Sequence, residues 1–222
     1  MLLRVMAQPE FVRARRPEHK RQRREAILTA ARELAAESGV RNVSLGSVAA
    51  AVGIAKSNVV RYFGTREEIY LELMTECWQE WADAVTARLR EATSGDEVIA
   101  ALTETLAARP LFCDLLSHVS TSLEHNVSVP AARAFKRAVL AVLASVAEEV
   151  TEAHPDLAGD EGLELSAAAT GLAGMLYPAA NPSPTMVELY AQDPDIAAAC
   201  PPFVPTMTRT LTVLAAGLRA LR

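Results

Sequence analysis

The chain is poor in aromatic residues and cysteine, and it has no long unbroken apolar run. Aromatic residues make up 5% of its 222 residues, whereas 41 residues are alanine. Abundant alanine with few aromatic and β-branched residues favours helix over sheet. Half of the residues are apolar, which excludes a disordered, collagen-like or low-complexity chain. The composition therefore predicts an all-α fold with a sizeable core.

Cysteine is also too sparse to hold the fold together. The three cysteines, Cys77, Cys113 and Cys200, are widely spaced and form no CxxC pair, so a disulfide framework or a zinc site is not expected.

The longest run without charge, residues 165–187, is interrupted by prolines and predicts a buried helix and a loop rather than a membrane span. We expect a cytoplasmic protein with no membrane partner.

Motifs for catalysis are missing as well. The sequence has no GxGxxG, P-loop, HExxH or GxSxG pattern, and its four histidines are scattered. His118 and His125 could share a helix face, but no third ligand stands at a suitable spacing. No catalytic residue, metal site or cofactor is expected, and an enzyme is disfavoured.

Charge is present but unevenly distributed. The net charge is −5, yet residues 1–70 hold 13 Lys/Arg and 7 Asp/Glu, which leaves 9 and 20 for residues 71–222. The first part therefore carries +6 and the second −11. A basic N-terminal third suggests a nucleic-acid-binding head on a body with another task. Chance clustering of solvated charges is the alternative.

Helical periodicity and turn signals divide the chain. Residues 1–19 are expected to be a flexible basic arm with Arg13, Arg15 and Arg16, and the first helix is expected from about Lys20 to Gly39. Two short helices are predicted at 45–52 and 56–63, followed by a long helix from Thr65 to about residue 94. Further amphipathic segments cover 96–108, 110–124, 131–153, 160–177 and 206–221. Residues 178–205 hold seven prolines and one expected helix at 186–192.

The segment from Ser44 to Ile69 has the pattern of a helix-turn-helix. A small residue, Ala49, stands where the two helices cross, and Gly53 follows four residues later for the turn. Apolar residues that could hold the second helix on the first are Val48, Val52, Ile54, Val59 and Tyr62. The second helix can then enter a major groove.

This segment resembles the DNA-binding head of the TetR family of transcriptional repressors. The resemblance runs from about Lys20 into the helix that opens with Arg66-Glu67-Glu68-Ile69, and includes Tyr62-Phe63. It implies a head at 20–65, a helical body at 66–222 for dimerisation and effector binding, and a homodimer on a palindromic double-stranded DNA operator. A small-molecule effector would release this repressor from DNA.

Position by position, the resemblance assigns DNA-binding roles to seven residues: Ser44, Lys56, Ser57, Asn58, Arg61, Tyr62 and Arg66. Asn58 could pair with adenine, and Arg61 or Lys56 with guanine. Ser44, Tyr62 and Arg66 match phosphate-contacting positions, and basic residues from Arg13 to Arg24 could add phosphate or minor-groove contacts. Arg66 could instead pair with a carboxylate, and Tyr62 could be core.

Three positions depart from the family pattern. Val60 stands where a tyrosine is usual, Ala55 where serine or threonine opens the recognition helix, and Gly46 has no side chain for DNA. Apart from these departures, an activator or architectural DNA binder with the same head stays open. The three departures themselves leave open a helical ligand-binding protein with weakened DNA affinity.

The body offers weaker signals. Candidate effector-binding residues are Trp78, Trp81, Phe112, Leu116, His118, Phe135, Met175 and Tyr177, each of which could instead be ordinary core. Candidate dimer-interface residues are Leu163, Ala167, Gly171, Gly174, Met207, Leu211, Leu214 and Leu218. The last four have the spacing of a helix-packing seam. The two expected helices that carry these residues, 160–177 and 206–221, could instead pack within one subunit.

Overall fold

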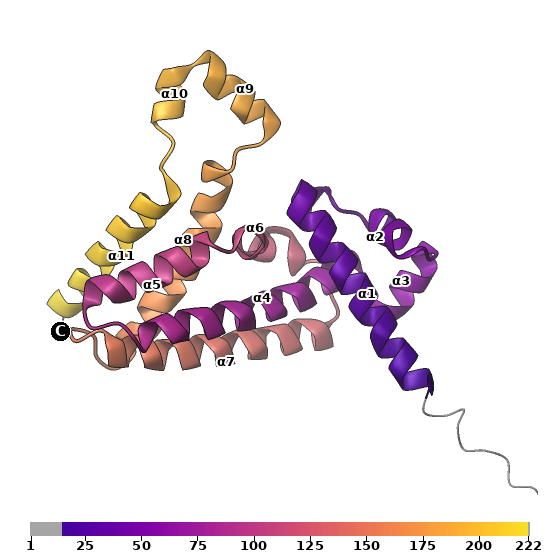
Figure 1. Cartoon of the computed structure of the whole chain (residues 1–222), viewed down its shortest axis with the longest axis horizontal. Coiled ribbons are helices and arrows are strands. Elements are labelled where there is room, and N and C mark those ends of the chain that lie inside the picture. The colour runs from indigo at the N-terminus through magenta and orange to yellow at the C-terminus, as the bar shows by residue number, and fades with distance from the viewer. Residues whose placement is uncertain (1–14, 222) are drawn as a thin grey trace, which may run out of the picture.

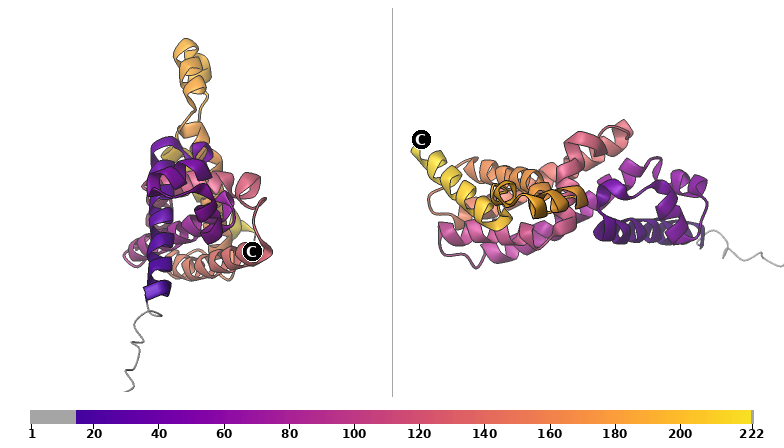
Figure 2. Two further views of the ribbon diagram at one scale, coloured as in Figure 1. Left: turned by 90° about the vertical axis from the view of Figure 1, so that its right-hand side faces the viewer. Right: turned by 90° about the horizontal axis from the view of Figure 1, so that it is seen from above.

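The computed structural model describes residues 15–221, and every regular element in that range is a helix (Figures 1 and 2). The head contains α1 (Arg15–Ser38), the short turn η2 (Val40–Asn42), α2 (Leu45–Val52) and α3 (Lys56–Phe63). The body contains α4 (Arg66–Leu89), α5 (Gly95–Ala107), α6 (Pro110–His118), the π-helical turn η3 (Val119–Leu123), α7 (Val129–Ala153), α8 (Glu161–Ala180), α9 (Pro184–Gln192), α10 (Pro194–Ala198) and α11 (Phe203–Ala220). The prediction of an all-α fold is confirmed.

Local signals set the limits of α2 and α3. The Ser44 hydroxyl accepts a hydrogen bond from the Ser47 N–H, and the Ser47 hydroxyl oxygen accepts one from the Ser44 N–H. This reciprocal pair satisfies amides that a helix start leaves free. Gly53 ends α2 with a φ of 68°, which a residue with a side chain adopts only at a cost. Both helices have the predicted limits.

Other limits differ from the sequence-based expectation. Helix α1 begins at Arg15, within the segment expected to be an arm, because Pro17 lies in its first turn, where a missing N–H costs no intrahelical bond. Helix α4 ends at Leu89, before the predicted end near residue 94. The expected helix at 110–124 is split into α6 and η3, and α10 was not expected.

Helices α4 and α8 organise the core. Helix α4 contacts α1 and α3 of the head and α5, α6 and α7 of the body, while α8 contacts α5, α6, α7 and α11. The apolar stripe of α4 is buried from Ile69 through Trp81 to Leu89, and it makes one hydrophobic core with the apolar sides of the neighbouring helices. Head and body are therefore joined by packing as well as by sequence.

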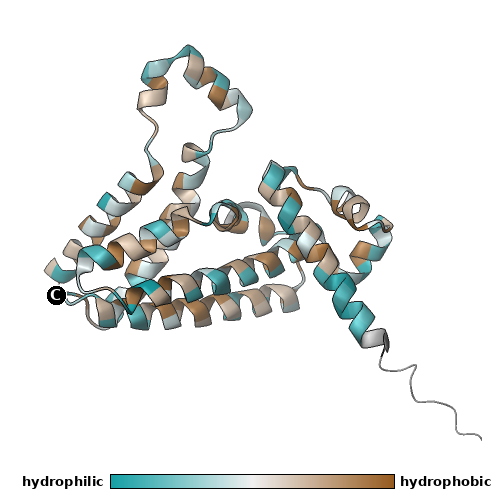
Figure 3. Ribbon diagram, viewed as in Figure 1, coloured by the Kyte–Doolittle hydropathy of each residue, from teal (hydrophilic) through white to brown (hydrophobic). Residues whose placement is uncertain are grey.

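Helices α9 and α10 form a hairpin that projects from the body between α8 and α11 (Figures 1 and 2). Neither helix contains a buried residue, and apolar and polar residues alternate along the hairpin (Figure 3). Within residues 15–221, no helix is both long enough and apolar enough to cross a membrane.

Candidate DNA interface and effector cavity

Helix α3 presents a polar face to solvent. Lys56, Ser57, Asn58 and Arg61 are exposed, whereas Val59 is fully buried and anchors the helix. This division follows from the helical repeat, which puts Val59 and Phe63 on the side that faces the head's core. The four predicted DNA-facing residues of α3 therefore share one accessible surface.

A hollow of about 530 Å³ lies between the start of α1 and this face of α3. Its lining residues are Lys20, Arg23, Ile54, Asn58, Arg61 and Tyr62. Three of them are cationic and none is acidic, so the hollow favours a negatively charged partner. The structure thus brings two basic residues of α1 together with Asn58 and Arg61, which are far away in sequence.

The three positions that depart from the family pattern lie at the surface of the head. Ala55 precedes α3 without a side-chain cap, Val60 is exposed beside Arg61, and Gly46 is exposed on α2. A Cβ atom at Gly46 would meet only the Ser44 hydroxyl, at 3.5 Å. The Ser44 side chain is exposed and caps α2, as predicted.

Arg66, a predicted phosphate contact, is held by contacts within the chain. Its Nε donates to the carbonyl oxygen of Val43 at 2.5 Å, Nη2 donates to the carbonyl of Val40, and Nη1 pairs with Glu67 at 3.3 Å. The guanidinium also lies 4.7 Å from the centre of the Tyr70 ring. With 19% of its side chain exposed, Arg66 joins α4 to the segment before α2.

The basic residues of α1 also separate into two groups. Arg24 pairs with Glu72, donates to the Tyr62 carbonyl at 2.6 Å and stacks 4.0 Å from the centre of the Phe63 ring. Arg21 pairs with Glu18 at 2.8 Å. Arg24 therefore holds α1 against α3 and α4, whereas Lys20 and Arg23 line the hollow. Arg13 lies outside the described residues, as do the side chains of Arg15 and Arg16.

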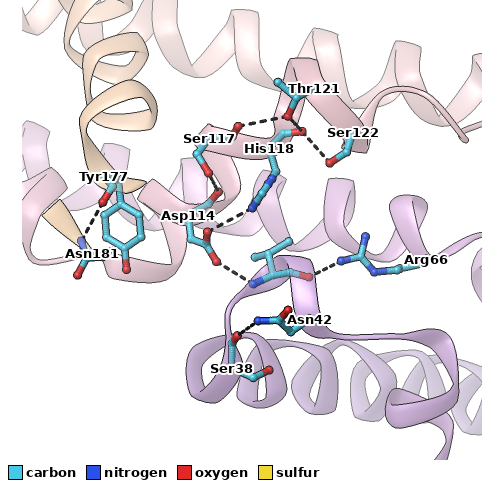
Figure 4. A network of polar contacts seen from close by, with 11 residues as sticks. Ser38, Asn42, Arg66, Asp114, Ser117, His118, Thr121, Ser122, Tyr177 and Asn181 are labelled. Carbon is cyan, nitrogen blue, oxygen red and sulfur yellow. Dashed lines mark hydrogen bonds and ion pairs between the residues drawn. The ribbon is translucent and has the colours of Figure 1, made fainter. Parts of the chain in front are cut away.

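Hydrogen bonds of the Val40 peptide join head and body, and Figure 4 shows its two partners, Asp114 and Arg66. Its carbonyl accepts from Arg66 of α4, and its N–H donates to Oδ2 of Asp114 in α6 at 2.7 Å. His118 Nε2 lies 3.5 Å from Oδ1 of the same carboxylate. Burial disfavours the charged form of Asp114, but bonds from His118 and the Val40 N–H outweigh it and lower the pKa of Asp114. A charged acceptor therefore fixes α6 to the head.

A cavity of about 460 Å³ lies between α4, α6, α7 and α8. It is lined by Met74, Trp78, Leu116, Ser117, Val119, Phe135, Lys136, Val139, Leu143, Ala167, Thr170, Gly171, Gly174 and Met175. Four predicted effector residues, Trp78, Leu116, Phe135 and Met175, meet there. Mostly apolar walls with a few polar groups are typical of small-molecule sites.

The other predicted effector residues lie elsewhere. Trp81 and Phe112 are buried against Trp78, and Trp81 donates to the Thr105 hydroxyl at 3.0 Å. Tyr177 lines a separate hollow beside α9 and α11. Trp81 and Phe112 thus support the cavity wall through Trp78, and His118 belongs to the junction, where it pairs with Asp114. None of these residues lines the cavity.

Sequence reasoning missed several lining residues. Lys136, Val139 and Leu143 recur at helical spacing on α7, and that spacing is the signal that could have identified them. Ala167, Gly171 and Gly174 also line the cavity, although the sequence assigned them only to a dimer interface. Gly174 is buried, and a Cβ atom there would lie 3.0 Å from the carbonyl carbon of Leu116, so it allows α6 to approach α8.

The α11 residues predicted to form a dimer seam pack within the single chain. Met207, Leu211 and Leu218 are buried within the single chain and Leu214 is half-buried, because this face of α11 packs on α5 and α8. On α8, by contrast, Leu163, Ala167 and Gly171 are exposed. The spacing on α11 indicated a helix-packing face correctly but not which helix covers it.

Two family models match the chain. Residues 27–73 match the bacterial regulatory proteins of the tetR family, and residues 75–222 match the tetracyclin repressor-like C-terminal domain. The second match alone covers more than half of the chain. The boundary between the two models lies within α4, which belongs to both the head's packing and the body's core.

Solved structures share the fold at low identity. A possible TetR family regulator from Streptomyces coelicolor A3(2) is 18% identical with a TM-score of 0.57, covering 90% of this chain and 100% of that chain. FadR from Bacillus subtilis, in complex with stearoyl-CoA, is 16% identical with a TM-score of 0.54, covering 87% and 98%. Thermus thermophilus FadR, a repressor in complex with lauroyl-CoA, is 17% identical with a TM-score of 0.51, covering 88% and 94%.

Curated protein sequences provide no match. The family models nevertheless agree with the geometry, since a helix-turn-helix head with an exposed basic face is followed by a helical body with a cavity. The chain belongs to the TetR family of DNA-binding transcriptional regulators.

Proposed function

We propose that this regulator is a repressor that binds a palindromic operator as a homodimer and leaves it when a small molecule enters the body's cavity. The observation that supports this best is the surface of α3, where exposed Asn58 and Arg61 border a hollow with Lys20 and Arg23. No carboxylate lines that hollow, so a phosphate backbone would meet no repulsion there.

The exposed residues divide into two roles. Asn58 would pair with adenine and Arg61 or Lys56 with guanine, since these side chains match the major-groove edges of those bases. Lys20, Arg23, Ser44, Ser57 and Tyr62 would contact phosphates and set the register without reading the sequence. One α3 helix of eight residues reads few base pairs, so specific binding requires a second copy about one DNA turn away.

Helix α6 supplies a route from the cavity to the head. Its residues Leu116 and Ser117 line the cavity, and its Asp114 accepts from the Val40 N–H. An effector that displaces α6 would therefore move η2, and with it α2 and α3. A coupling of about 1–3 kcal/mol would change operator affinity by roughly 5–150-fold. The junction from Gly64 to Arg66 is where the head would turn against α4.

The test is footprinting on the DNA upstream of the gene, with the double variant Asn58→Ala/Arg61→Ala. We expect protection by the unchanged chain and none by the variant. The matched control, Gln79→Ala/Arg88→Ala, removes an amide and a guanidinium from exposed positions on α4 and should protect the same bases. If no sequence is protected at any salt concentration, the proposal is wrong.

Deletion of the gene separates repression from activation. Expression from the protected promoter should rise if the chain is a repressor, because the bound dimer then blocks transcription. A fall in expression would identify an activator with the same head.

A further inference from the structure

The effector cavity, which lies between α4, α6, α7 and α8, has a charged group at its mouth. Among the described residues that line the cavity, Lys136 is the one with a charge, and none of them is a carboxylate. The Lys136 side chain is 57% exposed, whereas Met74 and Trp78 of α4 are buried. The ammonium group of Lys136 therefore lies where the cavity opens to solvent, and the apolar wall lies inside.

The polar groups of the wall that are free to bind a ligand are hydrogen-bond donors. Trp78 Nε1 is buried and has no hydrogen-bond partner among the described residues, which is unfavourable until a bound molecule supplies an acceptor. The hydroxyl groups of Ser117 and Thr170 already donate to backbone carbonyls, at 2.7 Å from Ser117 and 3.1 Å from Thr170. A molecule that suits this wall therefore carries acceptors.

Three cations of α7 lie together near the mouth. Lys136 has three N–H donors, and Glu124 accepts from it at 2.6 Å, which leaves donors for a ligand. Arg133 precedes Lys136 by one helical turn, and Arg137 follows Arg133 by another. Both arginines are exposed, and neither makes an ion pair with another described residue. Three cations against one carboxylate leave a positive mouth on a body whose net charge is negative.

We infer that the effector is an amphipathic carboxylate, which binds with its carbon chain inside the cavity and its carboxylate at the mouth. Lys136 and Arg133 donate to the carboxylate, and Phe135, Val139 and Leu143 contact the chain. The carboxylate stays partly in water at this position, so it avoids the desolvation cost of a buried charge. This inference rests on the proposed role of the cavity and names the class of its effector.

The same groups disfavour the other two charge types of ligand. A cation would be repelled by the three basic side chains at the mouth, of which only Lys136 is paired. A neutral hydrocarbon would fill the apolar interior but would leave the Trp78 N–H without an acceptor. An anion with an apolar chain satisfies both the mouth and the interior.

Competition among ligands that share one alkyl chain tests the preference for an anion. The fluorescent reporter is the neutral probe N-phenyl-1-naphthylamine, displaced by decanoate, decanol or decylamine below their micelle concentrations. Decanoate should displace the probe at about a fivefold lower concentration than decanol, because its head group meets two partly exposed cations. Decylamine should be the weakest competitor.

A double variant tests the two residues assigned to the carboxylate. Arg133→Gln/Lys136→Gln should weaken decanoate binding about tenfold, since two partly exposed ion pairs are lost. It should leave the affinities for decanol and for the neutral probe unchanged, which also shows that the cavity is intact. The matched control, Arg88→Gln/Arg209→Gln, removes two positive charges from exposed positions of α4 and α11 and should bind decanoate as the unchanged chain does.

Val139→Trp, which fills the cavity, identifies the probe signal that belongs to it. If circular dichroism shows that this chain does not fold, Met175→Trp fills the cavity from its exposed edge instead. If the probe binds in the cavity but decanoate competes no better than decanol, or if the double variant keeps full affinity for decanoate, this inference is wrong and the effector cavity stands. If neither tryptophan variant removes a probe signal, the effector cavity fails and this inference fails with it.

Discussion

At the residue scale, two arginines of the helix-turn-helix region have different surroundings that the sequence does not distinguish. Arg61 is exposed on α3 at the edge of the basic hollow, whereas Arg66 donates to two backbone carbonyls of the segment before α2. The identity of the side chain is the same, so the difference depends on which backbone groups lie within its reach. Stability and DNA affinity should therefore respond separately to the two positions.

Arg66→Ala should lower the free energy of unfolding by about 2 kcal/mol, because two carbonyl groups lose a charged donor. Arg61→Ala should change it by less than about 0.5 kcal/mol, as an exposed position does, while weakening DNA binding. Urea denaturation measures the first effect and a mobility shift the second. An Arg66→Ala chain with unchanged stability but lost DNA affinity would show that Arg66 contacts DNA after all.

Asp114 makes the head–body contact sensitive to acid. Its pKa lies below the ordinary value of 3.8, so the folded state favours the carboxylate. The resulting stability is fully present above the unfolded pKa and is lost as the pH falls through the folded one.

Asp114→Asn should therefore destabilise the protein at pH 7, and the difference from the unchanged chain should shrink below about pH 4. Urea midpoints of both chains across this range are the measurement. A difference that stays constant down to about pH 2 would mean that ionisation of Asp114 adds nothing.

At the element scale, the contact between α6 and α8 depends on a glycine. A Cβ atom at Gly174 would lie 3.0 Å from the carbonyl carbon of Leu116, whereas one at Gly217 on α11 would meet nothing within 4 Å. Helix α6 supplies Leu116 and Ser117 to the cavity wall, and its Asp114 accepts the hydrogen bond from the head. A side chain at residue 174 therefore pushes on the element that joins cavity and head.

Gly174→Ala should lower the free energy of unfolding by roughly 1–3 kcal/mol through overpacking. Gly217→Ala should raise it by roughly 0.5–1 kcal/mol, since alanine restricts the unfolded chain and suits a helix. Thermal unfolding of the two variants gives the comparison. Equal effects of the same sign would contradict the close approach of α6.

Local signals made the head largely predictable. The limits of α2 and α3 are marked by Ser44, Gly53 and Gly64, which directly flank these helices. Because such signals act locally, both helices have the predicted bounds. The exposed face of α3 followed from the helical repeat. The roles of Arg24 and Arg66 did not, because their partners lie in other elements.

The body was predictable only as helices with apolar faces. The spacing of Met207, Leu211 and Leu218 indicated a packing face, but the helices that cover it, α5 and α8, are determined by tertiary structure. The cavity likewise combines residues from four helices and η3. Three aromatic residues predicted to line the cavity lie outside it: Trp81, Phe112 and Tyr177. Helical spacing does not show which neighbouring helix each of these rings meets.

At the scale of the whole molecule, the net charge of −5 combines a basic head with an acidic body. DNA binding releases counterions from the phosphates that the head neutralises, whereas binding of a neutral molecule in an apolar cavity releases none. Operator affinity should fall on the order of a thousandfold between about 50 and 200 mM salt. Binding of N-phenyl-1-naphthylamine should barely change over that range. Equal salt dependence of the two equilibria would contradict this division of tasks.

The central claim is that two copies of the head read DNA as a symmetric pair. Selection of bound sequences from a random pool tests it most directly, because every possible operator competes in the same tube. The account predicts an enriched inverted repeat whose half-sites lie about 34–36 Å apart, or a multiple of that distance, and no enrichment by the Asn58→Ala/Arg61→Ala chain. A pool without enrichment, or one enriched equally by that variant, would contradict it.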